Sequence, residues 1–286
     1  MEPPNQPPKL DKRQGIRRGV YVLPSLFTVG TLVCGYFAIL STLRGAQILA
    51  AGVATGLAVI AFDNAARAIG WAILFDGLDG RIARMTNTAS PFGREFDSLA
   101  DVIAFGVAPA FLAFVWGVRG VDEMAGRELI QHIRQVAWII TFAYVICGAA
   151  RLARFNIDTV KPTGDRRFFV GLPIPAAAGV VAAIVHWQKQ PLNAWEFAAG
   201  WLVVVGILAF LMVSRMRYYS FKALDLRKRR SYLAVIFIGL IIWGIWSFSE
   251  PVLLTLALTY ALSGILLRLT SKIRPHPPTP EEVHAA

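Results

Sequence analysis

Long apolar runs are the feature that most constrains this chain. Several of them approach or exceed about 18 residues, the length at which an apolar helix can cross a bilayer. The chain of 286 residues is 56% hydrophobic and only 16% charged, whereas soluble domains average about 25% charged residues. This balance excludes a soluble enzyme, a secreted disulfide scaffold and a disordered protein. We therefore expect an all-α integral membrane protein, a polytopic bundle of about eight transmembrane helices.

The expected spans follow one another along most of the chain. They are residues 22–43, 64–82, 98–117, 136–153, 170–187, 196–214, 231–249 and 252–269. A basic N-terminal segment (1–20) precedes this membrane domain (21–270), and a disordered tail (271–286) follows it. The apolar segment 47–62 is too short for a further span. It is interpreted as an extension of the first span, or as a re-entrant or interfacial piece.

The distribution of basic residues predicts the orientation of the spans. Of the 29 Lys and Arg residues, 23 lie in the N-terminal segment, in alternate loops and near the C-terminus, and five lie in the remaining loops. Basic loops stay on the cytoplasmic side, so we expect both termini and any site beside these loops to face the cytoplasm, in a multi-pass cell (inner) membrane. The net charge of +11 favours anionic membrane lipids as partners and not nucleic acid.

Four carboxylates at the ends of two neighbouring expected spans form the candidate reactive site. Asp76 and Asp79 are three residues apart, and Asp97 and Asp101 are four apart, so each pair lies on one helix face. About a dozen residues of connection allow the two helices to pack antiparallel and bring the four side chains together. Carboxylates in a membrane are costly without a partner. Hard oxygen ligands suit Mg²⁺ or Mn²⁺, and shared carboxylates could bridge two such ions.

The residues around the carboxylates indicate a phosphate-containing substrate. Gly80 leaves room beside Asp79, and Arg81 and Arg84 can bind phosphate or pyrophosphate. The local chemistry is therefore a metal-assisted reaction on a pyrophosphate or phosphodiester at a membrane surface. An intramembrane prenyltransferase would carry a second acidic motif, and a transporter would tend to show an internal repeat. Neither feature is visible in the sequence.

The spacing of this stretch also resembles a known family. The pattern Asp76-x2-Asp79-Gly80-x2-Ala83-Arg84-x8-Gly93-x3-Asp97-x3-Asp101 is similar to the signature of the CDP-alcohol phosphatidyltransferases. These are membrane enzymes that move a phosphatidyl group from CDP-diacylglycerol to an alcohol and release CMP. The segments GAARLARFN (148–156) and FFVGLPIPAAAG (168–179) resemble the bacterial phosphatidylserine synthase branch, which implies L-serine as the acceptor. The alternative acceptors are glycerol 3-phosphate, inositol phosphate and choline.

The resemblance implies roles for individual residues. Asp76, Asp79 and Asp97 would hold one divalent ion, Asp76, Asp97 and Asp101 would hold a second, and Asp101 would be the catalytic base. The residues implied to bind CDP-diacylglycerol are Gly80, Arg84 and Ser90, and those implied to lie near the acceptor and its attacked phosphate are Arg151, Arg154 and Asn156. The family resemblance also implies a homodimer.

Some positions depart from the family pattern or belong to other interactions. Ser25 and Thr31 stand where members of this branch often have Asn, which weakens any role assigned to them. Asp63 and Arg67 are four residues apart at a span entrance and are expected to form a structural ion pair. His186 is expected to lie near the outer interface without a partner.

Overall fold

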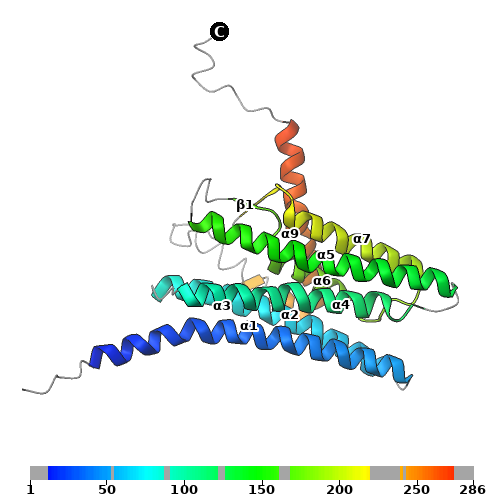
Figure 1. Cartoon of the computed structure of the whole chain (residues 1–286), viewed down its shortest axis with the longest axis horizontal. Coiled ribbons are helices and arrows are strands. Elements are labelled where there is room, and N and C mark those ends of the chain that lie inside the picture. Colours follow the sequence, from blue (N-terminus) through cyan, green and yellow to red (C-terminus); the bar gives the residue numbers. More distant parts are fainter. Residues whose placement is uncertain are drawn as a thin grey trace, which may run out of the picture.

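The computed structural model describes residues 12–52, 55–86, 91–121, 126–160, 168–219, 239–240 and 243–273. Most of its long helices run roughly along one common axis, whereas the orange-red C-terminal helix runs across this direction (Figure 1). The helices are α1 (Lys12–Ala51), α2 (Thr55–Thr86), α3 (Pro91–Asp101), the π-helix η1 (Val102–Val107), α4 (Ala108–Val118), α5 (Arg127–Val160), α6 (Ile174–Gln188), α7 (Trp195–Val213) and α9 (Ser249–Ile273).

Six helical segments of the described chain are long and apolar enough to cross a membrane. They are Leu26–Ala51, Thr55–Ile82, Phe92–Val118, Arg127–Ile157, Trp195–Val213 and Ser249–Arg268. Each corresponds to one of the eight spans expected from the sequence. Large apolar side chains on their outer faces, such as Phe37, Trp138 and Phe210, are exposed, as lipid-facing residues are. The chain is thus an integral membrane protein.

The expected span 170–187 is a shorter helix than its hydropathy predicts. Helix α6 contains only 15 residues, Ile174–Gln188, and about 17 are needed to cross a bilayer. Gly171 has a φ of +83°, and Pro173 is the N-terminal cap of α6, so the apolar residues before Ile174 lie in a turn. Pro173 and Pro175 lie at the start of this helix. The expected span 231–249 lies mostly outside the described residues.

The apolar segment 47–62 is divided between two helices. Residues 47–51 form the end of α1, so this part is an extension of the first span, as expected. Residues 55–62 instead form the beginning of α2. The second span therefore starts about nine residues earlier than expected. Gly52 lies between the two helices with a φ of +65°, a conformation that favours glycine. The segment does not form a separate helix, so it adds no span between the first and the second expected spans.

A small two-stranded sheet is the exception to the all-α expectation. Strand β1 (Phe168–Val170) pairs antiparallel with β2 (Arg217–Tyr219), with Phe169 opposite Tyr218. The Tyr218 side chain is fully buried, and its hydroxyl donates to the carbonyl of Ala261 on α9 (3.2 Å). Burial raises the pKa of Tyr218 to about 12, so the phenol stays a hydrogen-bond donor. The sheet therefore fixes α9 near the ends of α5 and α7.

The ends of the chain are described only in part. Residues 12–20 of the expected N-terminal segment are the first turns of α1, and residues 1–11 lie outside the described part of the chain. Of the expected tail, residues 271–273 end α9, and residues 274–286 lie outside the described part of the chain.

The core is built from small residues and a few large ones. Alanines of α2, α4 and α6 are buried together with Phe62, Ile69 and Trp116, and small residues let transmembrane helices approach closely. Helix α1 lies close to η1 at Gly35, where an added Cβ would lie 2.7 Å from the Cα of Ala104. A larger residue at position 35 would push α1 away from η1, the turn that follows Asp101.

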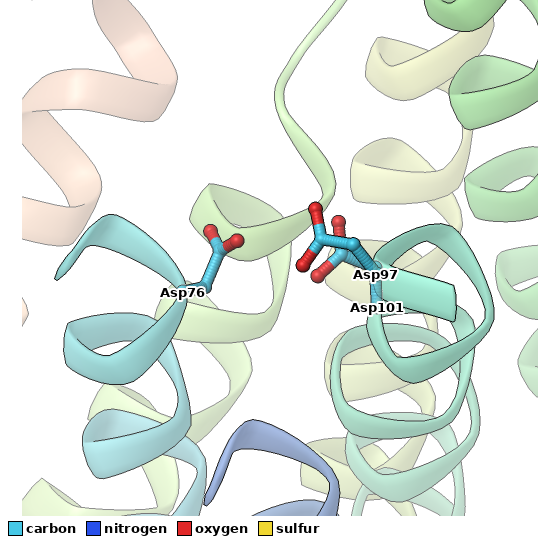
Figure 2. A group of neighbouring side chains, drawn as sticks. All are labelled: Asp76, Asp97 and Asp101. Carbon is cyan, nitrogen blue, oxygen red and sulfur yellow. The ribbon is translucent and has the colours of Figure 1, made fainter. Parts of the chain in front are cut away.

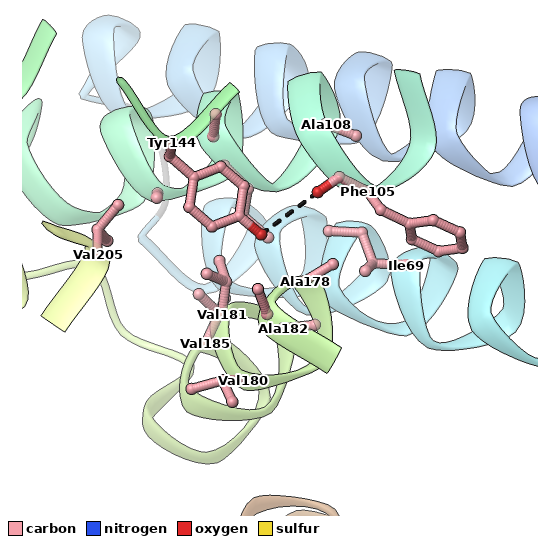
Figure 3. Close-up of a cluster of buried hydrophobic side chains, with 14 of the residues drawn as sticks. Ile69, Phe105, Ala108, Tyr144, Ala178, Val180, Val181, Ala182, Val185 and Val205 are labelled. Carbon is pink, nitrogen blue, oxygen red and sulfur yellow. Dashed lines mark hydrogen bonds between the residues drawn. The ribbon is translucent and has the colours of Figure 1, made fainter. Parts of the chain in front are cut away.

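A hydrogen bond between α5 and η1 holds this part of the core (Figure 3). Pro109 near the start of α4 has no N–H to give to the carbonyls one turn earlier. The carbonyl of Phe105 accepts a hydrogen bond from the hydroxyl of Tyr144 at 3.3 Å, and Tyr144 and Phe105 are both fully buried. A polar backbone group left inside the bundle is thereby satisfied.

Candidate active site

Three carboxylates meet at one end of the bundle. Asp76 projects from the last third of α2, and Asp97 and Asp101 project from one face of α3 (Figure 2). One oxygen atom from each of the three lies within 4.8 Å of the others. The spacing of four residues on α3 gives the shared face, and Asp76 of α2 lies opposite to it (Figure 2). The sequence predicts that four carboxylates meet, and the structure brings these three together.

Asp79, the fourth predicted carboxylate, lies one turn further along α2 and has a different partner. Its Oδ2 accepts a hydrogen bond from the Thr28 hydroxyl of α1 at 2.5 Å. The side chain is buried, and its Oδ1 has no hydrogen-bond partner. Asp79 is therefore beside the group of three without being one of its members.

The buried unpaired side-chain atoms of the described residues all belong to this end of the bundle. They are Oδ1 of Asp79, Oδ1 of Asp101 and Nε of Arg151. A buried polar atom without a partner costs roughly 1–3 kcal/mol, and more when the group is charged. Such atoms call for a ligand that the chain itself does not supply.

The donor set fits a divalent cation. Three carboxylates within 4.8 Å of one another repel each other unless a cation lies between them. Carboxylate oxygens are ligands that Mg²⁺ and Mn²⁺ prefer, and the unpaired Oδ1 of Asp101 is free to bind one. Asp76, Asp97 and Asp101 could hold one ion, and Asp79 could add its unpaired oxygen to a neighbouring position.

A π-helical turn directly follows Asp101. Residues 102–107 form η1 between α3 and α4, and Ala104 and Phe105 in it are buried. Such turns are uncommon and frequently occur at functional sites. Here η1 packs against α1 at Gly35 and against α5 at Tyr144. Two neighbouring helices therefore fix the helix that carries Asp97 and Asp101.

The predicted CDP-diacylglycerol residues are only partly described. Beside the aspartates, Gly80 has open space where a Cβ would be, as expected for a surface that a substrate approaches. The side chain of Arg84 and the whole of Ser90 lie outside the described residues.

The predicted acceptor residues are brought to the same end of the bundle by the last turns of α5. Arg151 is only 7% exposed, and its positive charge acts on the carboxylates of Asp101 and Asp76. The amide of Asn156 donates to the hydroxyl of Ser98 at 2.9 Å, next to Asp97. These two residues therefore lie close to the aspartates.

Arg154 has a contact that the sequence does not predict. Its Nη2 donates to the carbonyls of Met212 (3.4 Å) and Val213 (3.3 Å), at the end of α7. A cation at this position satisfies terminal carbonyls and interacts favourably with the helix dipole. Arg154 thus connects α5 to α7, and its guanidinium is less available to a substrate than that of Arg151.

Two residues near the site are absent from the sequence-based set. Thr28 binds Asp79, whereas Thr31, noted from the family pattern, donates to the carbonyl of Phe27 in its own helix at 3.2 Å. Tyr260 of α9 interacts electrostatically with Arg151, and its ring contacts that of Tyr218 at 5.9 Å between centroids. A hydroxyl in an apolar span is a signal for both, but their partners are distant in the sequence.

A second polar cluster lies nearer the opposite end of the bundle. The expected ion pair between Asp63 and Arg67 is present at 2.8 Å. The expectation that His186 has no partner is wrong, because its Nδ1–H donates to Asp63 and its Nε2 accepts from the Ser249 hydroxyl at 3.0 Å. This cluster joins α2, α6 and α9, and it is separate from the three-aspartate group.

Comparison with known proteins places this geometry in a family. A model of the CDP-alcohol phosphatidyltransferase family matches residues 21–211. A CDP-diacylglycerol–serine O-phosphatidyltransferase of Helicobacter pylori is 37% identical over 227 residues, which are 78% of this chain and 82% of that protein. A protein of the same name from Methanocaldococcus jannaschii is 34% identical over 214 residues, 75% of this chain and 88% of that one. One from Mycobacterium tuberculosis is 32% identical over 199 residues, 68% and 58% of the two chains.

The matched region contains every residue of the acidic motif and the whole of α5 and α6. It ends before β2 and α9, so Tyr218 and Tyr260 lie outside the matched residues. Because the family model covers well over half of the sequence and the motif forms one site, this chain belongs to the CDP-alcohol phosphatidyltransferase family.

Proposed function

We propose that this chain is a CDP-diacylglycerol–serine O-phosphatidyltransferase. It transfers the phosphatidyl group of CDP-diacylglycerol to the hydroxyl of L-serine, and CMP is released. The observation that carries the proposal is the convergence of Asp76, Asp97 and Asp101 within 4.8 Å. It is supported by the relatives of this name, which the chain matches over most of their length.

The four aspartates act on the pyrophosphate of the substrate through bound cations. Asp76, Asp79, Asp97 and Asp101 would hold two divalent cations, Mg²⁺ or Mn²⁺. Bound there, the cations would neutralise charge on the pyrophosphate and on the departing CMP. The open surface at Gly80 admits the cytidine diphosphate, and Arg84 and Ser90 complete its binding site.

Asp101 is the group that accepts the proton of the acceptor. Its carboxylate is buried and its Oδ1 has no partner, so one of its oxygen atoms would bind a cation while the other takes the proton of the seryl hydroxyl. The serine oxygen then forms a bond to the phosphorus that bears diacylglycerol, and the bond from that phosphorus to the CMP oxygen breaks. Exclusion of water around Asp101, which is 8% exposed, favours transfer to serine over hydrolysis.

Arg151 binds the acceptor. A buried guanidinium with an unpaired Nε is suited to a carboxylate, which it can bind through two parallel hydrogen bonds. Its charge acts on Asp101, so a serine carboxylate bound here has its hydroxyl near the base. Arg154 binds the end of α7 and Asn156 binds Ser98 of α3. These contacts hold this end of α5 close to the acceptor and the attacked phosphate.

The membrane placement completes the proposal. The enzyme lies in the cell (inner) membrane with the aspartates facing the cytoplasm, because the loops at that end carry most of the 29 basic residues. It acts as a homodimer among anionic lipids.

The test is an assay of the purified protein with CDP-diacylglycerol and an acceptor panel. Serine is expected to support metal-dependent CMP release and to become part of the lipid product. Glycerol 3-phosphate, inositol phosphate and choline are expected to give rates near background. Turnover with one of these acceptors and not with serine would keep the family chemistry and refute the serine assignment. No CMP release with any acceptor would refute the enzyme assignment.

A further inference from the structure

A cavity of about 550 Å³ lies at the end of the bundle away from the aspartates. Its apolar wall comes from Ala46 and Leu49 at the end of α1 and from Phe114 of α4. Its polar wall comes from Arg119, Arg134 and Asn193. Along α2, the distance from Thr55, near this end, to Asp76 is about 30 Å at ~1.5 Å per residue. This is about the thickness of the hydrocarbon core of a bilayer.

The two arginines bring positive charge that the described chain does not balance. Neither Arg119 nor Arg134 has an ion pair or side-chain hydrogen bond within the described ranges, and both are exposed. No acidic side chain lines the described part of the cavity. In contrast, Lys189 at the same end of the molecule is paired with Glu250.

The end of a helix accounts for the position of Arg119 but not for that of Arg134. Arg119 directly follows α4, where a cation interacts favourably with the helix dipole. Arg134 lies two turns inside the N-terminal part of α5, where the dipole gives a cation no gain. Its position on the wall of a cavity that also contains Arg119 therefore leaves two unpaired cations of the described chain available to one anion.

The shape and polarity of the cavity identify the class of that anion. Two guanidinium groups bind a phosphate well, and the adjacent wall of Ala46, Leu49 and Phe114 suits an acyl chain. A free phosphate would leave this apolar wall unused. A phospholipid has both parts, and its chains can continue from the cavity into the bilayer.

We propose that this cavity binds one anionic phospholipid from the leaflet opposite the catalytic aspartates. The lipid phosphate lies between Arg119 and Arg134, Asn193 donates to the headgroup, and an acyl chain lies along the end of α1. The site is distinct from that of the lipid substrate, which is bound at the other end of the bundle. It gives the chain a lipid contact on both faces of the membrane.

The experiment uses the full chain in nanodiscs of phosphatidylcholine and phosphatidylglycerol, followed by native mass spectrometry. The wild type is expected to retain one phosphatidylglycerol and to prefer it severalfold over phosphatidylcholine. The double variant Arg119→Gln/Arg134→Gln is expected to lower the retained fraction about tenfold. Arg127→Gln is the matched control, because it removes the same charge at the start of α5 outside the cavity, and retention should be unchanged.

A second variant keeps the test decisive if the double variant is unstable. Ala50→Trp leaves both arginines in place and fills the apolar part of the cavity, since Ala50 also lines it and is exposed. It should lower retention to a similar extent. Full retention in either folded variant would overturn the proposal. Displacement of the lipid by millimolar inorganic phosphate would also overturn it, as would a change of oligomeric state without loss of lipid.

Discussion

At the residue scale, Asp101 combines three properties that a base beside a phosphate needs. It is 8% exposed, it shares a group with Asp76 and Asp97, and one of its oxygen atoms has no partner. The substitution Asp101→Asn keeps the size of the side chain and removes the proton acceptor. We expect kcat for serine to fall by about 10²- to 10⁴-fold, the range of general base catalysis.

This result is measured as CMP release at saturating serine and Mg²⁺, together with the melting temperature of the variant. Glu95→Gln is the matched control, because Glu95 is also on α3 but is exposed, and its rate should match the wild type. A folded Asp101→Asn protein with full turnover would remove the base role from Asp101.

Thr28 is a residue whose importance follows from one hydrogen bond. It orients Asp79 from the neighbouring helix at 2.5 Å, and residues that orient metal ligands typically affect metal affinity by 10- to 100-fold. The variant Thr28→Val is expected to raise the Mg²⁺ concentration for half-maximal rate by about tenfold. Thr28→Ser should restore it, because the hydroxyl returns.

Thr31→Val provides the comparison for this prediction. Thr31 is equally buried on the same helix, but its hydroxyl bonds to the backbone of its own helix, so Mg²⁺ dependence should stay unchanged. An equal shift in both valine variants would mean that α1 packing, and not the bond to Asp79, sets the metal response.

At the element scale, the cluster of Asp63, His186 and Ser249 holds three helices together. Asp63 is 8% and His186 4% exposed, and the imidazole donates to one and accepts from the other residue across α2, α6 and α9. Helix α9 lies outside the residues matched by the family model, and this cluster and Tyr218 attach it to the matched part of the chain.

The substitution His186→Phe removes the imidazole but keeps an aromatic ring. Asp63 would keep its pair with Arg67 and lose its buried donor, which costs about 1–3 kcal/mol. We expect a lower melting temperature in detergent and greater proteolysis at α9. Ser249→Ala should have a smaller effect, because Ser249 is only half-buried. A melting temperature equal to the wild type in His186→Phe would show that the cluster does not contribute to stability.

At the scale of the whole molecule, the sequence predicts the membrane helices and three of the four aspartates that it expects to meet, because both depend on local patterns. Apolar runs give six of the spans within about ten residues, and the spacing of Asp97 and Asp101 places both on one helix face. The length of α6 is different, because Gly171 and Pro173 are apolar by composition but form a turn.

Contacts between distant residues could not be predicted in the same way. Thr28 and Asp79 are 51 residues apart, and His186 and Asp63 are 123 apart. Nothing in the local pattern says which faces of α1 and α2 meet. The helices that carry these residues must first be packed before a hydroxyl or imidazole can be assigned a partner, so their roles appear only in the structure.

The packing of like charges at one end of the bundle predicts how the whole molecule responds to metal. Three carboxylates within 4.8 Å oppose folding through their repulsion, and a cation that binds only the folded state stabilises it by about 2.7 kcal/mol at a concentration of 100 Kd. We expect Mg²⁺ to raise the melting temperature of the protein and EDTA to lower it.

The variant Asp97→Asn separates this effect from general action of salt on a membrane protein. It removes one ligand and one of the repelling charges, so in EDTA it should be at least as stable as the wild type, and Mg²⁺ should add little. Glu95→Gln, which changes an exposed charge two residues away, should keep the full Mg²⁺ shift. Differential scanning fluorimetry in detergent measures both. An equal shift in wild type and Asp97→Asn would place the metal elsewhere, and no shift in the wild type would argue against a cation held by this group.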